Sequence, residues 1–187
     1  DICSLIIYIP FVKPSSEELK LKGSIWSRVN STDAHLNLPP SIDFKYVKLF
    51  FETIQSLIGK DNILSLHDIS DGGVITTLFE MCYSGFKGIE INKNFQNGIQ
   101  LYNFLFSETP GVVLEILNAD YMKVRDTFIA SKVSYDIIGI TKRNTCLTFN
   151  YKIDDTLNTL NLPIYHLCQS YESEANKIEV KQYLKSV

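Results

Sequence analysis

Short apolar runs alternate with amphipathic helical segments along the chain, and this alternation restricts its fold more than any other feature. The run from Ser4 to Ile9, SLIIYI, is typical of a buried strand. Residues 47–58 place apolar side chains at helical spacing, after Ser41 or Asp43 as the N-cap and before Gly59, which ends the helix. Strands that alternate with helices predict helices packed against a mixed sheet.

The same two patterns place the other elements. We expect strands over residues 62–66, 88–91, 112–116, 134–140 and 146–151, and helices over 23–29, 74–83 and 118–130, the last capped by Asn118. Residues 100–106 fit either type. The fold class we expect is α+β, with a mixed or antiparallel β-sheet covered by α-helices in residues 1–152. Residues 153–187 then form a more polar, partly helical tail that packs outside this domain.

Composition excludes several classes of protein. The 187 residues are 45% hydrophobic and 21% charged, which is typical of a globular chain that can bury a core without disulfides. The longest apolar run, from Leu5 to Val12, is far too short to span a bilayer. The formal net charge of −3 argues against nucleic-acid binding through a general basic field. We therefore expect neither a membrane nor a nucleic acid among the partners.

The cysteines and the N-terminus indicate a compartment. Cys3, Cys82, Cys146 and Cys168 form no C-x-x-C pair, and none lies in a turn that would present a nucleophile. We interpret them as reduced packing residues of a cytoplasmic protein. Because the chain starts at Asp1, with no initiator Met and no basic stretch before its first apolar run, we expect a piece of a larger polypeptide without a signal peptide.

One segment carries chemistry: residues 64–73, which we expect to run from the end of a strand through the tight polar loop HDISDGG, at 67–73, into a helix. Gly72 and Gly73 let the backbone approach a ligand, and free N–H groups at a helix start favour phosphate. Asp68 is a hard oxygen ligand of the kind that Mg²⁺ prefers beside phosphates, as is Asp71. The Ser70 hydroxyl can donate to a phosphate oxygen. His67 could act in acid–base chemistry or donate a hydrogen bond.

A structural interpretation of the same residues stays open. Asp and Ser before a helix are ordinary caps, Gly-Gly is an ordinary turn, and a single His at a strand end is usually structural. His35 and His166 are more typical of surface positions than of catalysts. Trp26 and the pair Phe50–Phe51 are more typical of a core than of stacking platforms.

The segment HDISDGGVITTLFEMCYSG, residues 67–85, resembles phosphoribosylformylglycinamidine synthase, whose second half carries HDRSDGGL…TLAEMAFAG. Further matches occur in the same order: LKGS at 21–24 with LGGSALAQ, the helix 44–58, LFSETPGVVL at 105–114 with LFNEELGAVLQV, and the strand 137–139. The resemblance covers about residues 4–150. The chain departs from the family pattern at Lys22, Arg28, Ile69 and Thr109, which affects expected substrate contacts more than the fold.

The resemblance implies an ATP-dependent C–N ligase of purine biosynthesis that makes formylglycinamidine ribonucleotide from formylglycinamide ribonucleotide, glutamine and ATP. This chain is similar to the C-terminal AIR-synthase-like half of the second module, which contributes to an auxiliary ADP and Mg²⁺ site in that family. Carried over, Asp68 would ligate Mg²⁺, and Ser70, Gly72 and Gly73 would approach phosphate. His67 would orient the loop, and Asp71 would cap the following helix.

The implied partners are the rest of the same polypeptide, namely a nucleotide-binding half-module and a glutaminase domain that the tail would reach, and a small-molecule substrate. The isolated piece would be inactive, with no catalytic residue of its own. Three alternatives remain: a non-catalytic nucleotide-binding or assembly domain, another ATP-dependent enzyme of the AIR synthase superfamily, and an interaction domain without ligand.

Overall fold

The computed structural model describes residues 4–11, 18–30, 43–60 and 62–173. Seven strands form one sheet in the order β2-β4-β1-β5-β3-β6-β7. All neighbours are antiparallel except β3 and β6, which are parallel, so the expected mixed sheet is confirmed. The strands are β1 (Ser4–Pro10), β2 (Ser65–Asp68), β3 (Gly88–Asn94), β4 (Gly111–Leu117), β5 (Asp136–Lys142), β6 (Cys146–Ile153) and β7 (Thr156–Pro163).

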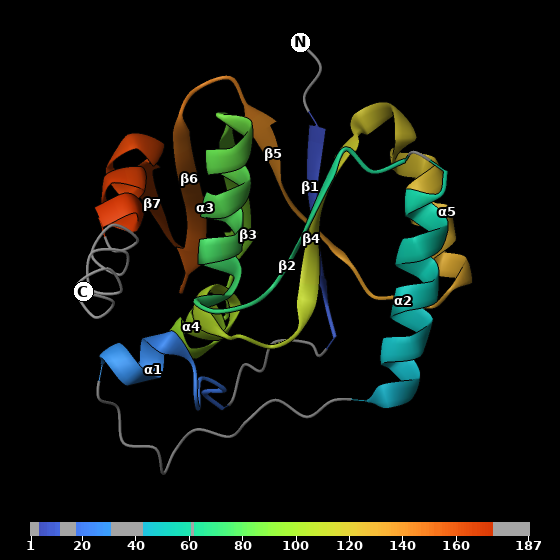
Figure 1. Ribbon diagram of the computed structural model, residues 1–187. Helices are drawn as coiled ribbons and strands as arrows, with labels where there is room; N and C mark the ends of the chain where they lie inside the picture. Colours follow the sequence, from blue (N-terminus) through green and yellow to red (C-terminus); the bar gives the residue numbers. More distant parts are fainter. Residues whose placement is uncertain (1–3, 12–17, 31–42, 61, 174–187) are drawn as a thin grey trace, which may run out of the picture.

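The sheet has helices on both faces, as the fold class predicts (Figure 1). Helices α3 and α4 pack against one face, and α2 lies beside α5 on the other. A short helix, α1, precedes α2, and a single 3₁₀ turn, η2, precedes α5. The helices are α1 (Ile25–Val29), α2 (Phe44–Ile58), α3 (Gly73–Gly85), α4 (Gly98–Phe106), η2 (Asn118–Asp120) and α5 (Tyr121–Ala130).

Strand β1 lies near the centre of the sheet and is buried on both faces. Its side chains alternate between two hydrophobic clusters: Ile6 and Tyr8 join α3 and α4, whereas Ile7 and Ile9 join α2 and α5. This arrangement explains why the run contains almost no polar residue, because a strand covered on both sides cannot alternate apolar with polar side chains. The expectation of a buried first strand is confirmed.

Local sequence determines the ends of α2 as expected. The Asp43 carboxylate accepts hydrogen bonds from the N–H groups of Lys45 and Tyr46, so Asp43 is the N-cap, and Gly59 is the C-cap. Ser41, the other candidate cap, lies outside the described residues. The ambiguous residues 100–106 belong to α4, whose start is capped by the Asn97 side chain.

Several boundaries differ from the expectation by up to three residues. Strand β2 begins at Ser65, not at residue 62, because its pairing with β4 joins Ser65 to Glu115 and Asp68 to Val112. Asn118 does not cap a helix; it begins η2, and the following helix α5 has no side-chain cap.

The chain beyond residue 152 continues the sheet. Strand β7 pairs with β6 along eight residue pairs, from Thr156 opposite Ile153 to Pro163 opposite Cys146. Residues 164–173 are helical, as expected for part of the tail. Ile164 at the start of this helix is 3% exposed within the α3–α4 cluster, which Leu162 and Leu167 also contact. The expectation that residues 156–173 pack outside the main domain is therefore wrong.

Candidate turn between β2 and α3

The HDISDGG segment forms the turn that leads from β2 into α3. Ile69 extends the pairing of β2, since its N–H donates to the Gly111 carbonyl at 2.9 Å. Gly72 and Gly73 then have φ angles of +85° and +75°, a conformation that residues with a side chain rarely adopt. The two glycines reverse the chain so that α3 starts directly at the end of the edge strand.

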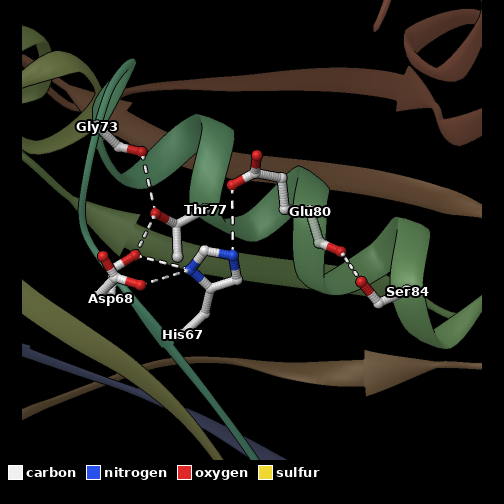
Figure 2. A network of polar contacts seen from close by, with 6 residues as sticks. All are labelled: His67, Asp68, Gly73, Thr77, Glu80 and Ser84. Carbon is white, nitrogen blue, oxygen red and sulfur yellow. Dashed lines mark hydrogen bonds and ion pairs between the residues drawn. The ribbon is translucent and has the colours of Figure 1, made fainter. Parts of the chain in front are cut away.

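His67 joins β2 to α3 (Figure 2). Its Nδ1 lies 2.8 Å from the Asp68 carbonyl oxygen, and its Nε2 lies 3.4 Å from the Glu80 carboxylate on α3. The Asp68 carbonyl also accepts from the Thr77 hydroxyl at 3.1 Å. Because a carbonyl oxygen can only accept, Nδ1 is the donor in its contact. This geometry suits a residue that orients the turn.

Asp68 and Ser70 present their side chains to solvent. The Asp68 side chain is 73% exposed, and its Oδ1 lies 3.6 Å from His67 Nδ1. No group of three or more His, Cys, Asp or Glu residues that could hold a metal occurs within residues 4–11, 18–30, 43–60 and 62–173. Mg²⁺ is commonly held by one or two carboxylates together with substrate phosphates. A single exposed carboxylate therefore fits an ion that arrives with a phosphate group.

The two glycine amides already have acceptors. The Gly72 N–H donates to the Glu108 carboxylate at 2.8 Å, and the Gly73 N–H donates to the Ser70 carbonyl at 3.1 Å. The same Glu108 oxygen accepts from the Ile25 N–H at the start of α1, also at 2.8 Å. Sequence reasoning missed this role of Glu108, because 36 and 83 residues separate it from its two donors.

A pocket of about 230 Å³ opens beside the turn, between α1 and the first turns of α3. Trp26 and Phe106 supply aromatic walls, with ring centroids 6.0 Å apart and planes at 29°. Gly72 and Thr76 supply its polar edge. Trp26 is only half-buried and lines this pocket, so its assignment to the core is wrong.

Some of the other roles expected from the sequence are confirmed by the structure, and others are wrong. Asp71 does not cap α3, because the N-cap is Gly72, which has no side chain that could accept from the first turn of the helix. Phe50 is buried as expected, but Phe51 is 54% exposed. Ile69, which stands where the family pattern has Arg, is buried in the α3–α4 cluster and serves packing. The remaining histidines are His166, which is exposed as expected, and His35, which lies outside the described residues.

The described cysteines behave as packing residues. Cys82 on α3 is 1% exposed, and burial raises the pKa of its thiol to about 12. Because the thiolate is the reactive form, such a thiol is a poor nucleophile at neutral pH. Cys146 and Cys168 are half-buried free thiols, and Cys3 lies outside the described residues.

The sequence matches the family model described as AIR synthase related protein, C-terminal domain, over residues 12–149. This chain belongs to that family. The match starts after β1 and ends before β7, although both strands belong to the same sheet as the matched part. The AIR synthase related domain of this chain therefore includes flanking strands that the family model does not cover.

Curated relatives of this AIR synthase related domain are much longer proteins. It is 41% identical over 101 residues to a probable phosphoribosylformylglycinamidine synthase of Arabidopsis thaliana, covering 54% of the chain and 7% of the relative. It is 31% identical over 173 residues to phosphoribosylformylglycinamidine synthase of Dictyostelium discoideum, covering 84% and 12%. It is also 29% identical over 140 residues to probable membrane antigen 3 of Saimiriine herpesvirus 2, covering 75% and 11%. The chain thus spans about a tenth of the length of these relatives.

Solved structures share the fold at low sequence identity. "T. maritima PurL complexed with FGAR" aligns with a TM-score of 0.66 at 9% identity, over 89% of this chain and 28% of that one. E. coli HypE, a hydrogenase maturation protein, aligns with a TM-score of 0.51 at 15% identity, over 87% and 50%. These structures support the α+β domain architecture. Within the described residues, no helix of this AIR synthase related domain is long and apolar enough to cross a membrane.

Proposed function

We propose that this chain is part of a phosphoribosylformylglycinamidine synthase, an ATP-dependent C–N ligase, and that it contributes an auxiliary nucleotide site rather than the reacting centre. The similarity to two synthases, one of them along 84% of the chain, is the observation that carries the proposal. The tail would lead toward the glutaminase domain, and the whole protein would act in the cytoplasm on formylglycinamide ribonucleotide, glutamine and ATP.

The proposed ligands at the turn are Mg²⁺ and ADP or ATP. Asp68 would hold the ion, which would neutralise phosphate charge, and the exposed Ser70 hydroxyl would donate to a phosphate oxygen. His67 would keep the turn in place through its contacts with the Asp68 carbonyl and Glu80. Gly72 and Gly73 would allow close approach of the phosphate.

A second candidate is a nucleotide-binding or assembly domain without catalytic partners. It is favoured by the similarity to probable membrane antigens 3 and 75 of Saimiriine herpesvirus 2, whose names describe no enzyme. The HypE neighbours likewise keep open another member of the superfamily.

The first expected result concerns the size of the native polypeptide. An antibody against this chain should detect a protein many times larger than 21.3 kDa in source-cell extract, because the aligned part of the chain covers only 7% and 12% of the two synthases. Denaturing electrophoresis followed by blotting measures it. A single band near 21 kDa would contradict the synthase proposal and favour a free-standing binding domain.

The second expected result separates a structural from a catalytic nucleotide. In the full-length protein, Asp68→Ala should abolish most of the rise in melting temperature that Mg²⁺ and ADP cause, because ligand binding stabilises only through the native state. A ligand at a hundred times its Kd contributes about 2.7 kcal/mol, so the loss should be readily measured by calorimetry. Turnover at saturating substrate should stay within about twofold of the wild type, which corresponds to a change in activation free energy below roughly 0.5 kcal/mol.

Asp71→Ala is the matched control, since Asp71 is an exposed carboxylate three residues away that makes no cap. It should keep the ligand-induced rise. If Asp68→Ala instead removes turnover at unchanged melting temperature, the site is catalytic and the auxiliary assignment is wrong.

A further inference from the structure

Glu108 lies at the junction of α1, the Gly72 turn and the loop before β4. Its two neighbours fix it there: Ser107 and Thr109 are each 8% exposed, and their hydroxyl oxygens lie 2.6 Å apart. One Glu108 oxygen accepts two backbone hydrogen bonds, from Gly72 and Ile25. The carboxylate is therefore held by the backbone on both sides.

The Glu108 carboxylate accepts from backbone N–H groups, which are the donors that also bind free anions. A carboxylate and a phosphate oxygen accept the same hydrogen bonds from backbone N–H groups, and such bonds are stronger than those to a neutral acceptor. Among the ion pairs of the described residues, none includes Glu108. Within the described residues, the donors to this carboxylate are therefore the backbone N–H groups of Gly72 and Ile25.

We infer that Glu108 is a positioning residue that accepts from the Gly72 amide and competes for this amide with the phosphate group that binds the turn. The inference rests on the proposed nucleotide site and adds a residue that controls its affinity. Gly72 has one N–H, so the Glu108 carboxylate and a phosphate oxygen compete for it. Only a ligand of higher charge density, or one that Mg²⁺ and Asp68 also hold, displaces the internal anion.

Displacement also affects α1, because the same oxygen holds the Ile25 N–H. Ile25 and Trp26 line the 230 Å³ pocket together with Gly72, so a change at the turn reaches the indole. Trp26 is the single tryptophan of the chain and packs against Phe106 and Tyr102, at 6.0 and 5.4 Å between ring centroids. Its fluorescence therefore reports the position of α1.

Glu108→Gln tests the competition in the full-length protein. The side chain keeps its shape but becomes a neutral acceptor, so Mg²⁺–ADP should bind about tenfold more tightly, the size expected when a charge-assisted bond becomes an ordinary one. Isothermal titration calorimetry with Mg²⁺–ADP measures the Kd. Glu52→Gln is the matched control, because Glu52 is an exposed residue of α2 that pairs with Lys48, and it should leave the Kd unchanged.

A second variant tests, in the absence of ligand, whether Glu108 holds α1 in place. In the 187-residue chain, Glu108→Ala should shift Trp26 emission to longer wavelength, whereas Glu52→Ala should not. A merely structural role for Glu108 would weaken nucleotide binding in the Gln variant. If the wild type binds Mg²⁺–ADP and Glu108→Gln binds it equally or more weakly, this inference is overturned and the proposed nucleotide site stands. Absence of Mg²⁺–ADP binding in the wild type and in the Gln variant overturns the proposed nucleotide site and the inference with it.

Discussion

Ending the chain at residue 152 should abolish its cooperative unfolding transition. This change removes β7 and helix 164–173, so all eight pairs between β6 and β7 are lost and β6 becomes an open edge. Ile164, which is buried, leaves the α3–α4 cluster together with the partly buried Leu162 and Leu167, and a fully buried side chain of this size contributes about 1.5–3 kcal/mol. Added to the lost strand pairing, this is a large fraction of the 5–15 kcal/mol by which a domain is usually stable.

Urea unfolding followed by circular dichroism of chains 1–152, 1–173 and 1–187 measures this effect. The 1–173 chain keeps every described strand and helix and serves as the control, with a midpoint close to that of the full chain. An unchanged midpoint and slope for the 1–152 chain would show that the domain ends there, as the sequence alone predicts.

Gly73→Ala should lower the free energy of unfolding by at least about 2 kcal/mol. At φ +75° a Cβ atom strains the backbone, and here it would also lie 2.7 Å from the Leu105 carbonyl oxygen and 2.8 Å from the Phe106 carbonyl carbon. Both neighbours are backbone atoms at the end of α4, so they cannot rotate away. The variant must move α3 away from α4 or distort the turn that holds the candidate site.

Gly98→Ala is the control for this substitution. Gly98 is the first residue of α4, where a Cβ would meet no atom within 4 Å, so Ala should be neutral or stabilise the chain by up to about 1 kcal/mol. Chemical denaturation of both variants compares them with the wild type. Equal stability of the two would mean that α3 and α4 do not approach as closely as the structure shows.

The local pattern of the sequence was sufficient for most elements. Helix α2 follows from apolar spacing, the Asp43 cap and Gly59, all of which act within a few residues. Strand β1 follows from an apolar run that only burial on both faces explains. Residues 64–73 likewise predict a strand, a glycine turn and a helix, although His67 and Asp68 belong to the strand and not to the expected loop.

Strand β7 could not be predicted from its own residues. Leu157, Leu160 and Leu162 are spaced by three and two positions, a mixture that suits neither a helix nor a one-sided strand. At the edge of the sheet the strand needs little apolar surface, and its hydrogen bonds to β6 decide its conformation. Both ends of β2 are set in the same way by β4, so the polar residues His67 and Asp68 belong to the strand.

The sequence by itself determined the family, the order of most elements before β7 and the residues of the turn. Only the tertiary structure decided which groups meet there. Asp71 stands next to the helix start yet caps nothing, whereas Glu108, 36 residues further along the chain, holds the Gly72 amide. The physical reason is range: caps and periodicity act within one helical turn, whereas the acceptor of a backbone amide is chosen by how distant segments pack.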